Sequence, residues 1–304
     1  MTLKKISSSI AVLLFVVIAS SGQNKPSAPF KEISNISYME KSKVEVDSLQ
    51  RLNLVLPDKV KDSPILIWIG GGAWSYVNRN MEMDLGRRFA KEGISFASVG
   101  HRLSAATWKI PTQTTGVIHP AHIKDLALAF KWIYDHASTY GYSKDKIFVG
   151  GFSSGAHLAA LLAMDKKYLE ELGLSLNNIK AIIPIAGAYD IVDYNNYFLN
   201  SEESSSLAET HVKAVFGDTE KAMHDASPTS YVEGLKVPML LISENSTYRY
   251  TKIFEDKLRA TDHRNFQVLH INSMGHGELW RNLSFDDNSI YRTYVINFIK
   301  QIVK

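Results

Sequence analysis

The sequence predicts an α/β fold in which a mostly parallel central sheet carries helices on both faces. Three observations support this prediction. Continuous apolar runs alternate along the chain with segments of helical periodicity, as in crossover connections between parallel strands. Several of these runs end directly in glycines. The 304 residues are 45% hydrophobic and 21% charged, an ordinary globular composition that allows a large buried core.

The apolar runs define the expected strands. PILIWIG is continuous rather than alternating, which predicts a strand buried on both faces of the sheet. Similar runs recur down the chain, so that the expected strands cover residues 64–70, 94–100, 146–150, 181–187, 238–243 and 266–272. Ligands of such sheets bind beyond the carboxyl ends of the strands, so functional residues should directly follow these runs.

Helical patterns lie between the expected strands. Segment 121–139 carries one apolar stripe at three- and four-residue spacing, and 290–303 reads as a last helix. The sequence shows no internal repeat, and α/β folds of this size are often one domain. We therefore expect residues 36–304 to form a single domain.

The N-terminal segment resembles a secretory signal peptide. Lys4 and Lys5 precede an apolar run, and small residues ending in Gly22 follow it. We expect residues 1–22 to be a cleaved signal peptide and the protein to be secreted or periplasmic. The alternative is an uncleaved membrane anchor, although the apolar run is short for a bilayer-spanning helix. Residues 23–35 are polar, contain Pro26 and Pro29, and read as a linker.

The composition excludes several classes of function. The chain has no cysteine, which rules out disulfides, thiolate catalysis and cysteine-type metal sites. The net charge is only +3 and no long basic block is present, so nucleic-acid binding has no electrostatic basis. We expect neither a nucleic-acid partner nor, once the signal peptide is removed, a membrane partner.

The stretch KIFVGGFSSGAHLAA contains a candidate nucleophile. It fits G-x-S-x-G around Ser153, whereas centring the motif on Ser154 would place Phe152 and Ala156 where glycines belong. An apolar strand precedes the motif and a helical pattern follows it. The start of that helix supplies free backbone N–H groups, so the N–H of Ser154 is a candidate oxyanion donor. The alternative is a glycine-rich turn without chemistry.

A second glycine-rich loop, WIGGGAW, follows the expected strand 64–70. Glycines let backbone N–H groups approach a reacting carbonyl closely, so Gly71 and Gly72 are candidates for the second oxyanion donor. A phosphate-binding loop is excluded because no G-x-x-x-x-G-K-[ST] pattern follows. A simple tight turn is the remaining alternative.

One of the ten histidines fits a catalytic base. His276 lies between glycines just past the expected last strand, where the chain order nucleophile, acid, base places it. His270 falls inside that strand and is expected to be a packed or surface residue. The remaining histidines lack metal-ligand spacing, and in HPAH, His119 to His122, a proline precedes the helix. No metal site is expected.

The acid of the triad should follow the strand 238–243. Glu244 is the first carboxylate there, and the next ones, Glu255 and Asp256, lie inside a helical pattern. The extra methylene of a glutamate suits a position this early after the strand. Asp190 is the alternative, although a helix-cap or turn role suits it better.

A series of motifs supports a family resemblance from about Ile33 to Lys304. In order they are WIGGGAW (68–74), HRL (101–103), HPAHIKD (119–125), GFSSGAHLA (151–159), GAYD (187–190) and ASP (226–228). In this order and spacing the chain resembles α/β-hydrolase-fold esterases, most closely the bacterial feruloyl/acetyl-xylan-esterase-like and arylformamidase-like group. The resemblance implies a single α/β-hydrolase domain with a serine nucleophile.

The sequence also departs from the pattern of that group. Gly70 stands where the group has a histidine in the oxyanion loop, and Phe152 stands where it has one before the nucleophile. The acid of the group falls on Ser246. The resemblance therefore keeps Ser153 and His276 and leaves two readings of the acid: Glu244 substitutes for it, or the triad is a dyad of low activity.

Together these observations predict a secreted serine carboxylesterase that forms an acyl-enzyme and needs no cofactor. The resemblance and the expected export favour acetyl or feruloyl esters, on a small substrate or an acylated polysaccharide. Trp74 and Trp280 are candidate walls of the substrate pocket, or else core residues. The alternatives are a degenerate hydrolase that only binds a ligand or partner, and an amide or formamide hydrolase of the same fold.

Overall fold

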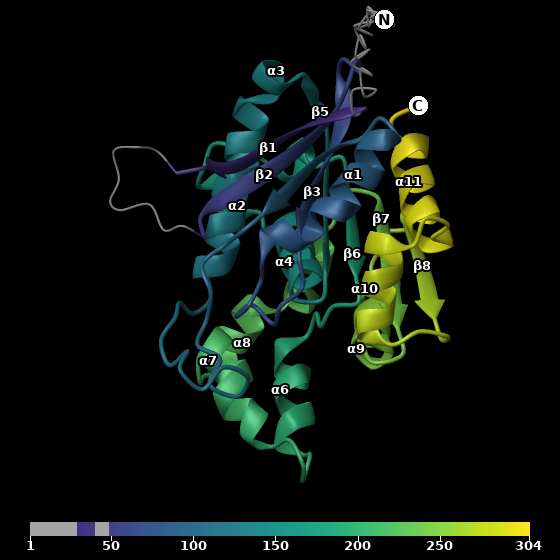
Figure 1. The fold of residues 1–304 in the computed structure, drawn as a ribbon. Helices are drawn as coiled ribbons and strands as arrows, with labels where there is room; N and C mark the ends of the chain where they lie inside the picture. Colours follow the sequence, from purple (N-terminus) through teal and green to yellow (C-terminus); the bar gives the residue numbers. More distant parts are fainter. Residues whose placement is uncertain (1–28, 40–48) are drawn as a thin grey trace, which may run out of the picture.

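A single sheet of eight strands forms the centre of the molecule (Figure 1). The computed structural model describes residues 29–39 and 49–304. The order across the sheet is β1-β2-β4-β3-β5-β6-β7-β8. The strands are β1 Phe30–Ser37, β2 Arg51–Pro57, β3 Ser63–Ile69, β4 Ser95–Val99, β5 Tyr142–Phe152, β6 Ala181–Ile185, β7 Met239–Glu244 and β8 Phe266–Ile271.

Helices cover both faces of this sheet. The α-helices are α1 Met83–Lys91, α2 Ala121–Asp135, α3 Ala137–Tyr140, α4 Ser154–Met164, α5 Lys167–Glu170, α6 Ile191–Leu199, α7 Ala214–Phe216, α8 Glu220–Ala226, α9 Tyr248–Arg259, α10 His276–Phe285 and α11 Ile290–Ile302. Short 3₁₀ and π segments are η1 Arg79–Glu82, η2 Leu176–Asn178, η3 Ala208–Lys213 and η4 Pro228–Gly234. Among the described residues no helix has the length and apolar character needed to cross a membrane.

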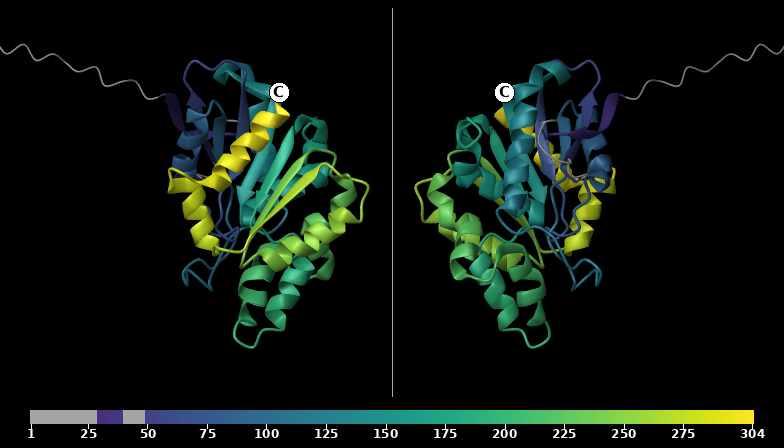
Figure 2. Two further views of the ribbon diagram at one scale, coloured as in Figure 1. Left: turned by 90° about the vertical axis from the view of Figure 1, so that its right-hand side faces the viewer. Right: turned by 90° about the vertical axis from the view of Figure 1, so that its left-hand side faces the viewer.

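Two hydrophobic cores lie on the two faces of the sheet. One contains apolar side chains of α2, α4 and α9, and the other those of α1, α10 and α11. The helices between β6 and β7, shown in green, extend beyond the carboxyl end of β6 (Figures 1 and 2). The predicted α/β fold with helices on both faces is confirmed. The candidate site residues Gly71, Ser153 and Glu244 lie at the edge of the sheet where strands β3, β5 and β7 end.

The parallel part of the sheet matches the sequence-based expectation more closely than its edge does. The six expected strands correspond to β3 to β8, which pair in parallel. The expected helix 121–139 is divided into α2 and α3 at His136.

Two antiparallel strands were not expected. β2 pairs antiparallel with both β1 and β4, and β1 begins at Phe30. Residues 30–35 therefore belong to the sheet, and the predicted linker 23–35 is wrong for this part. Polar residues such as Asn53 interrupt the apolar run of β2, and β1 is only partly buried, so neither has the pattern of a central strand. The predicted signal peptide, 1–22, lies outside the described residues.

Candidate active site

Ser153 occupies a strained turn between β5 and α4. Its backbone has φ 56° and ψ −119°, a conformation that residues with a side chain rarely adopt. Its N–H donates a 2.9 Å hydrogen bond to the carbonyl of Ile185 in β6. A Cβ at Gly155 would lie 2.0 Å from the carbonyl oxygen of Ile69, so only glycine lets α4 start this close to β3. The flanking glycines thus hold the serine at the end of the strand.

The glycine loop that follows β3 lies against this serine. A Cβ added to Gly71 would be 3.2 Å from the Cβ of Ser153. Gly72 has φ +148°, and a Cβ there would lie 2.6 Å from the backbone nitrogen of Val77. Within the described ranges, the N–H groups of Gly71, Gly72 and Ser154 have no hydrogen-bond acceptor. Free N–H groups beside a nucleophile are the donors that an oxyanion requires.

His276 and Glu244 form a contact next to the serine. The Nδ1 atom of His276, the first residue of α10, lies 3.0 Å from Oε1 of Glu244, the last residue of β7. The other carboxylate oxygen accepts a 2.6 Å hydrogen bond from the backbone N–H of Ser246. The Glu244 side chain is fully buried, whereas that of His276 is 38% exposed. The centre of the imidazole ring lies 4.7 Å from that of the ring of Phe152, which precedes Ser153.

The surroundings of Glu244 favour its charged form. Burial alone would raise the pKa of this carboxyl, but the hydrogen bonds from His276 and from the Ser246 backbone outweigh burial and lower it. An ionised carboxylate on Nδ1 fixes the imidazole tautomer and leaves Nε2 free to accept a proton. Ser246, where the resemblance places an acid, supports Glu244 through its backbone instead.

Asp190, the alternative acid, is engaged elsewhere. It caps the N-terminus of α6 by accepting a 3.0 Å hydrogen bond from the N–H of Asp193. Its other oxygen accepts hydrogen bonds from Thr229 and from Lys257. These contacts engage both oxygens of the Asp190 carboxylate, and no contact between Asp190 and His276 is seen among the described residues.

Ser153 and His276 line one cavity of about 310 Å³. The cavity is bordered by Gly71, Gly72, Tyr76, Asn78, Met81, Glu82, Phe152, Gly277 and Trp280. Trp280, which was predicted as a possible pocket wall, therefore borders this cavity. Trp74 does not, because its 3% exposed indole is packed in the core against Phe216 and donates a hydrogen bond to His157. The prediction that Trp74 borders the substrate is wrong.

The remaining histidines have structural partners. His270 bridges Ser243 and Glu255 across β7, β8 and α9. His122, on α2, contacts the hydroxyl of Ser104 at 2.9 Å. Among the described residues no group of three or more histidine, aspartate or glutamate side chains is arranged to hold a metal.

Two of the sequence motifs meet at a partly buried ion pair. Arg102 of HRL contacts Asp125 of HPAHIKD through its guanidinium and also through its backbone N–H. Gln50 donates a further hydrogen bond to the same carboxylate at 2.7 Å. These motifs therefore fasten the loop after β4 to α2 and take no part in the cavity.

Sequence reasoning missed several residues of the cavity, among them the carboxylate Glu82. It ends η1, is 3% exposed and accepts hydrogen bonds from the indole N–H groups of Trp68 and Trp280. It stands in no recognisable motif, and only its burial and its partners reveal it.

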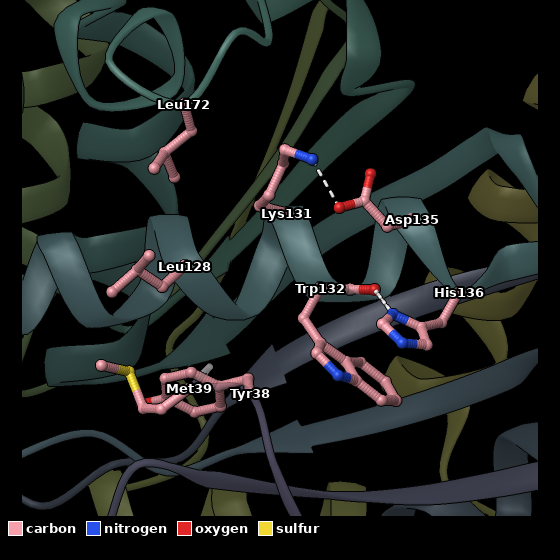
Figure 3. A pocket seen from close by; sticks show the side chains of 8 residues that line it. All are labelled: Tyr38, Met39, Leu128, Lys131, Trp132, Asp135, His136 and Leu172. Atoms are coloured by element: carbon pink, nitrogen blue, oxygen red, sulfur yellow. Dashed lines mark hydrogen bonds and ion pairs between the residues drawn. The ribbon is translucent and has the colours of Figure 1, made fainter. Parts of the chain in front are cut away.

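A second hollow, of about 340 Å³, lies along α2 (Figure 3). It shares no lining residue with the cavity at Ser153. Its charged side chains, Lys131 and Asp135, pair with each other, and His136 contacts the carbonyl oxygen of Trp132 (Figure 3). It offers no serine next to a histidine, so we assign the chemistry to the cavity at Ser153.

Comparison with known proteins shows which families this chain is similar to. The model of a family described as BD-FAE matches residues 52–247. The chain is 28% identical over 185 residues to esterase LipQ of Mycobacterium tuberculosis, covering 59% of this chain and 41% of that protein. It is 26% identical over 227 residues to esterase LipC of the same organism, covering 71% and 53%. It thus spans about half the length of these curated relatives.

Solved structures share the fold. Esterase B from Lactobacillus rhamnosis, with an inhibitor bound, superposes with a TM-score of 0.73 at 20% identity, covering 90% of this chain and 88% of that one. A truncated carbohydrate esterase from gut microbiota gives a TM-score of 0.65 at 19% identity, covering 91% and 99%. At these identities the likeness concerns the fold.

Proposed function

The chain belongs to the BD-FAE family, and on that premise we propose that it is a serine carboxylesterase that works through an acyl-enzyme. The observation that carries the proposal is the contact of Glu244 with His276, which lines the same cavity as Ser153. In the proposal these three residues act as acid, base and nucleophile. The names of the relatives, esterases LipQ and LipC, support the same reaction class.

The proposed reaction proceeds in two steps. In the first, Oγ of Ser153 attacks the ester carbonyl while Nε2 of His276 takes the hydroxyl proton. The tetrahedral oxyanion is held by N–H groups of the glycine loop and of Ser154, and Glu244 stabilises the imidazolium. The proton then passes to the leaving alcohol as the bond from the acyl carbon to that oxygen breaks.

In the second step, water hydrolyses the acyl-enzyme. His276 removes a proton from the attacking water, and the same N–H groups hold the second oxyanion. When this intermediate collapses, the proton returns to Oγ of Ser153 and the carboxylic acid is released. Atoms and charge balance with water as the only co-reactant.

For the substrate we propose acetyl or feruloyl esters, on a small alcohol or on an acylated polysaccharide. The cavity is bordered by the aromatic rings of Tyr76, Phe152 and Trp280, which suits an aromatic acyl group or the apolar face of a sugar. A structural relative described as a carbohydrate esterase supports the same class. The signal-like sequence of residues 1–22 supports export, so we propose a secreted or periplasmic location.

Hydrolysis of p-nitrophenyl acetate by the wild type and by Ser153→Ala tests the reaction class. We expect hydrolysis by the wild type and a loss on the order of 10⁴-fold or more in kcat for the variant, since the nucleophile is absent. A wild type no faster than Ser153→Ala would instead indicate a protein that binds without turnover. Acetylated xylan, methyl ferulate and an N-formyl amide, compared by kcat/KM, then separate the ester classes from amide hydrolysis.

A further inference from the structure

Glu82 is a buried carboxylate on the wall of the catalytic cavity, and the proposed reaction does not use it. It is 3% exposed, and within the described ranges no lysine or arginine pairs with it. Burying a carboxylate without a cation is costly, and an apolar side chain at such a position usually serves stability as well or better. Its contacts suggest another reason for a carboxylate here.

Each oxygen of Glu82 accepts a different indole N–H. Oε2 accepts from Trp68 at 2.8 Å, and Oε1 accepts from Trp280 at 3.2 Å. Trp68 lies in β3, two residues before the glycine loop begins at Gly70. Trp280 lies one turn after His276 on α10, so it moves with the helix that carries the base. The carboxylate thus joins the strand of the oxyanion loop to the helix of the base.

The glycine loop also packs directly on Glu82. A Cβ at Gly70 would lie 2.9 Å from Oε1, 3.1 Å from Cδ and 3.2 Å from Cγ of Glu82. Because the two indoles hold the carboxylate, it cannot swing aside freely. The next residue, Gly71, is the one that faces Ser153. A displacement of Glu82 is therefore transmitted to the proposed oxyanion donors through one peptide unit.

We propose that Glu82 is a positioning residue of the catalytic centre, whose ionised carboxylate holds the glycine loop and helix α10 at the spacing that hydrolysis needs. The role requires two acceptor oxygens, one for each indole. Glutamine has nearly the same shape but one acceptor, and its amide group would place an N–H against an indole N–H. The inference rests on the proposed esterase function and concerns the same cavity.

Glu82→Gln tests this role, with Asp165→Asn as the matched control. Asp165 is also a buried carboxylate, 6% exposed, at the far end of α4. For p-nitrophenyl acetate we expect Glu82→Gln to lower kcat by about 10- to 100-fold, the range expected when reacting groups are slightly misplaced, with KM changed far less. Asp165→Asn should keep the wild-type kcat. A Glu82→Gln variant that is folded and has wild-type kcat would overturn the proposal.

The pH profile of kcat separates positioning from simple structural support. Burial raises the pKa of Glu82, although the two indole hydrogen bonds oppose the shift. Protonation removes one acceptor, so the wild type at acid pH should resemble Glu82→Gln. We expect kcat of the wild type to fall towards acid pH partly because Glu82 becomes protonated. The profile of Glu82→Gln should lack this step. Identical profiles would contradict the proposal.

A double-mutant cycle tests the contact with Gly70. Gly70→Ala should lower kcat in the wild type, because the new methyl group displaces the carboxylate. In a Glu82→Ala background the same change should have little further effect, since the space is then empty. Losses that simply multiply would show that Gly70 and Glu82 act independently and would overturn the coupling.

Failure of this inference can be told apart from failure of the proposed function. If the wild type hydrolyses no ester faster than Ser153→Ala, the proposed function is wrong and the kinetic role of Glu82 falls with it. Whether Glu82 holds the indoles of Trp68 and Trp280 in place is then tested by near-ultraviolet circular dichroism. We expect Glu82→Gln to change the tryptophan bands and Asp165→Asn to leave them as in the wild type. Unchanged bands in both variants would show that Glu82 does not hold the two indoles in place.

Discussion

The carboxylate of Glu244 lies 3.0 Å from Nδ1 of His276 and at the same time accepts a 2.6 Å hydrogen bond from the backbone N–H of Ser246. One oxygen thus faces the base, and the other is held by the chain that follows β7. The longer side chain of glutamate lets the last residue of the strand reach the imidazole. An acid at position 246 is therefore not required for the histidine to have a carboxylate partner.

Replacing Glu244 should impair turnover, whereas replacing Asp190 should not. Glu244→Gln removes the charge that stabilises the imidazolium, and we expect a loss in kcat of up to about 10⁴-fold. Asp190→Asn keeps a good N-cap for α6, because asparagine and aspartate cap helices about equally well. Steady-state kinetics of both variants on p-nitrophenyl acetate check this, and full kcat in Glu244→Gln would exclude it as the acid.

A carboxylate moved to position 246 should partly replace Glu244. The N–H of Ser246 contacts the carboxylate that faces His276, so this position borders the acid site. In a Glu244→Ala background, we expect Ser246→Asp to recover at least about 10-fold in kcat, and Ser246→Asn, of the same size but uncharged, to recover less. Equal recovery by the two would show that shape rather than charge is responsible.

Stability at acid pH should depend on Glu244 with a defined sign. Its pKa is lowered in the folded protein from the ordinary value of 4.5. Between the two pKa values the unfolded chain binds more protons, so the stabilisation is complete above the ordinary value and is lost as the pH falls through the lowered one. The Tm advantage of Ser153→Ala over Ser153→Ala/Glu244→Gln should therefore shrink in this acid window. An advantage that grows towards acid pH would contradict the lowered pKa.

The glycine at position 71 should be required by the nucleophile. A Cβ there would lie 3.2 Å from both the Cβ of Ser153 and the ring of Phe152, which is tighter than most contacts of a Cβ atom. Gly71→Ala should therefore shift the loop and its N–H groups, with an expected loss of about 10²- to 10³-fold in kcat. The Tm of Gly71→Ala should stay close to that of the wild type, although its kcat falls. An alanine variant with wild-type kcat would exclude this loop from the oxyanion site.

Local patterns in the sequence determined much of the candidate site. The glycine register selected Ser153 over Ser154, because the strained turn and the close approach of α4 to β3 require glycines at fixed offsets. The position of His276 after the last apolar run followed from the order of elements in this fold class. The parallel strands were predictable because strands buried on both faces are apolar throughout.

The tertiary structure decided what the local patterns leave open. Which carboxylate meets His276 depends on how the chain turns after β7, and only the folded chain shows Glu244 there and Asp190 at the cap of α6. The sequence allowed Trp74 and Trp280 equally as pocket walls, and packing placed one in the core and the other at the cavity.

Two further features also depend on contacts between segments that are distant in the sequence. They are the hydrogen bonds of Glu82 to two indoles and the antiparallel pairing of β1 and β2. Glu82 and Trp280 are 198 positions apart, and β2 pairs with strands on either side of it. Periodicity and motifs report the neighbours of a residue along the chain, and contacts of this kind form only when distant segments pack together. The sequence alone thus determined the fold class and the candidate nucleophile and base, while packing decided which carboxylate contacts His276, which tryptophan borders the cavity and which carboxylate lies between the two indoles.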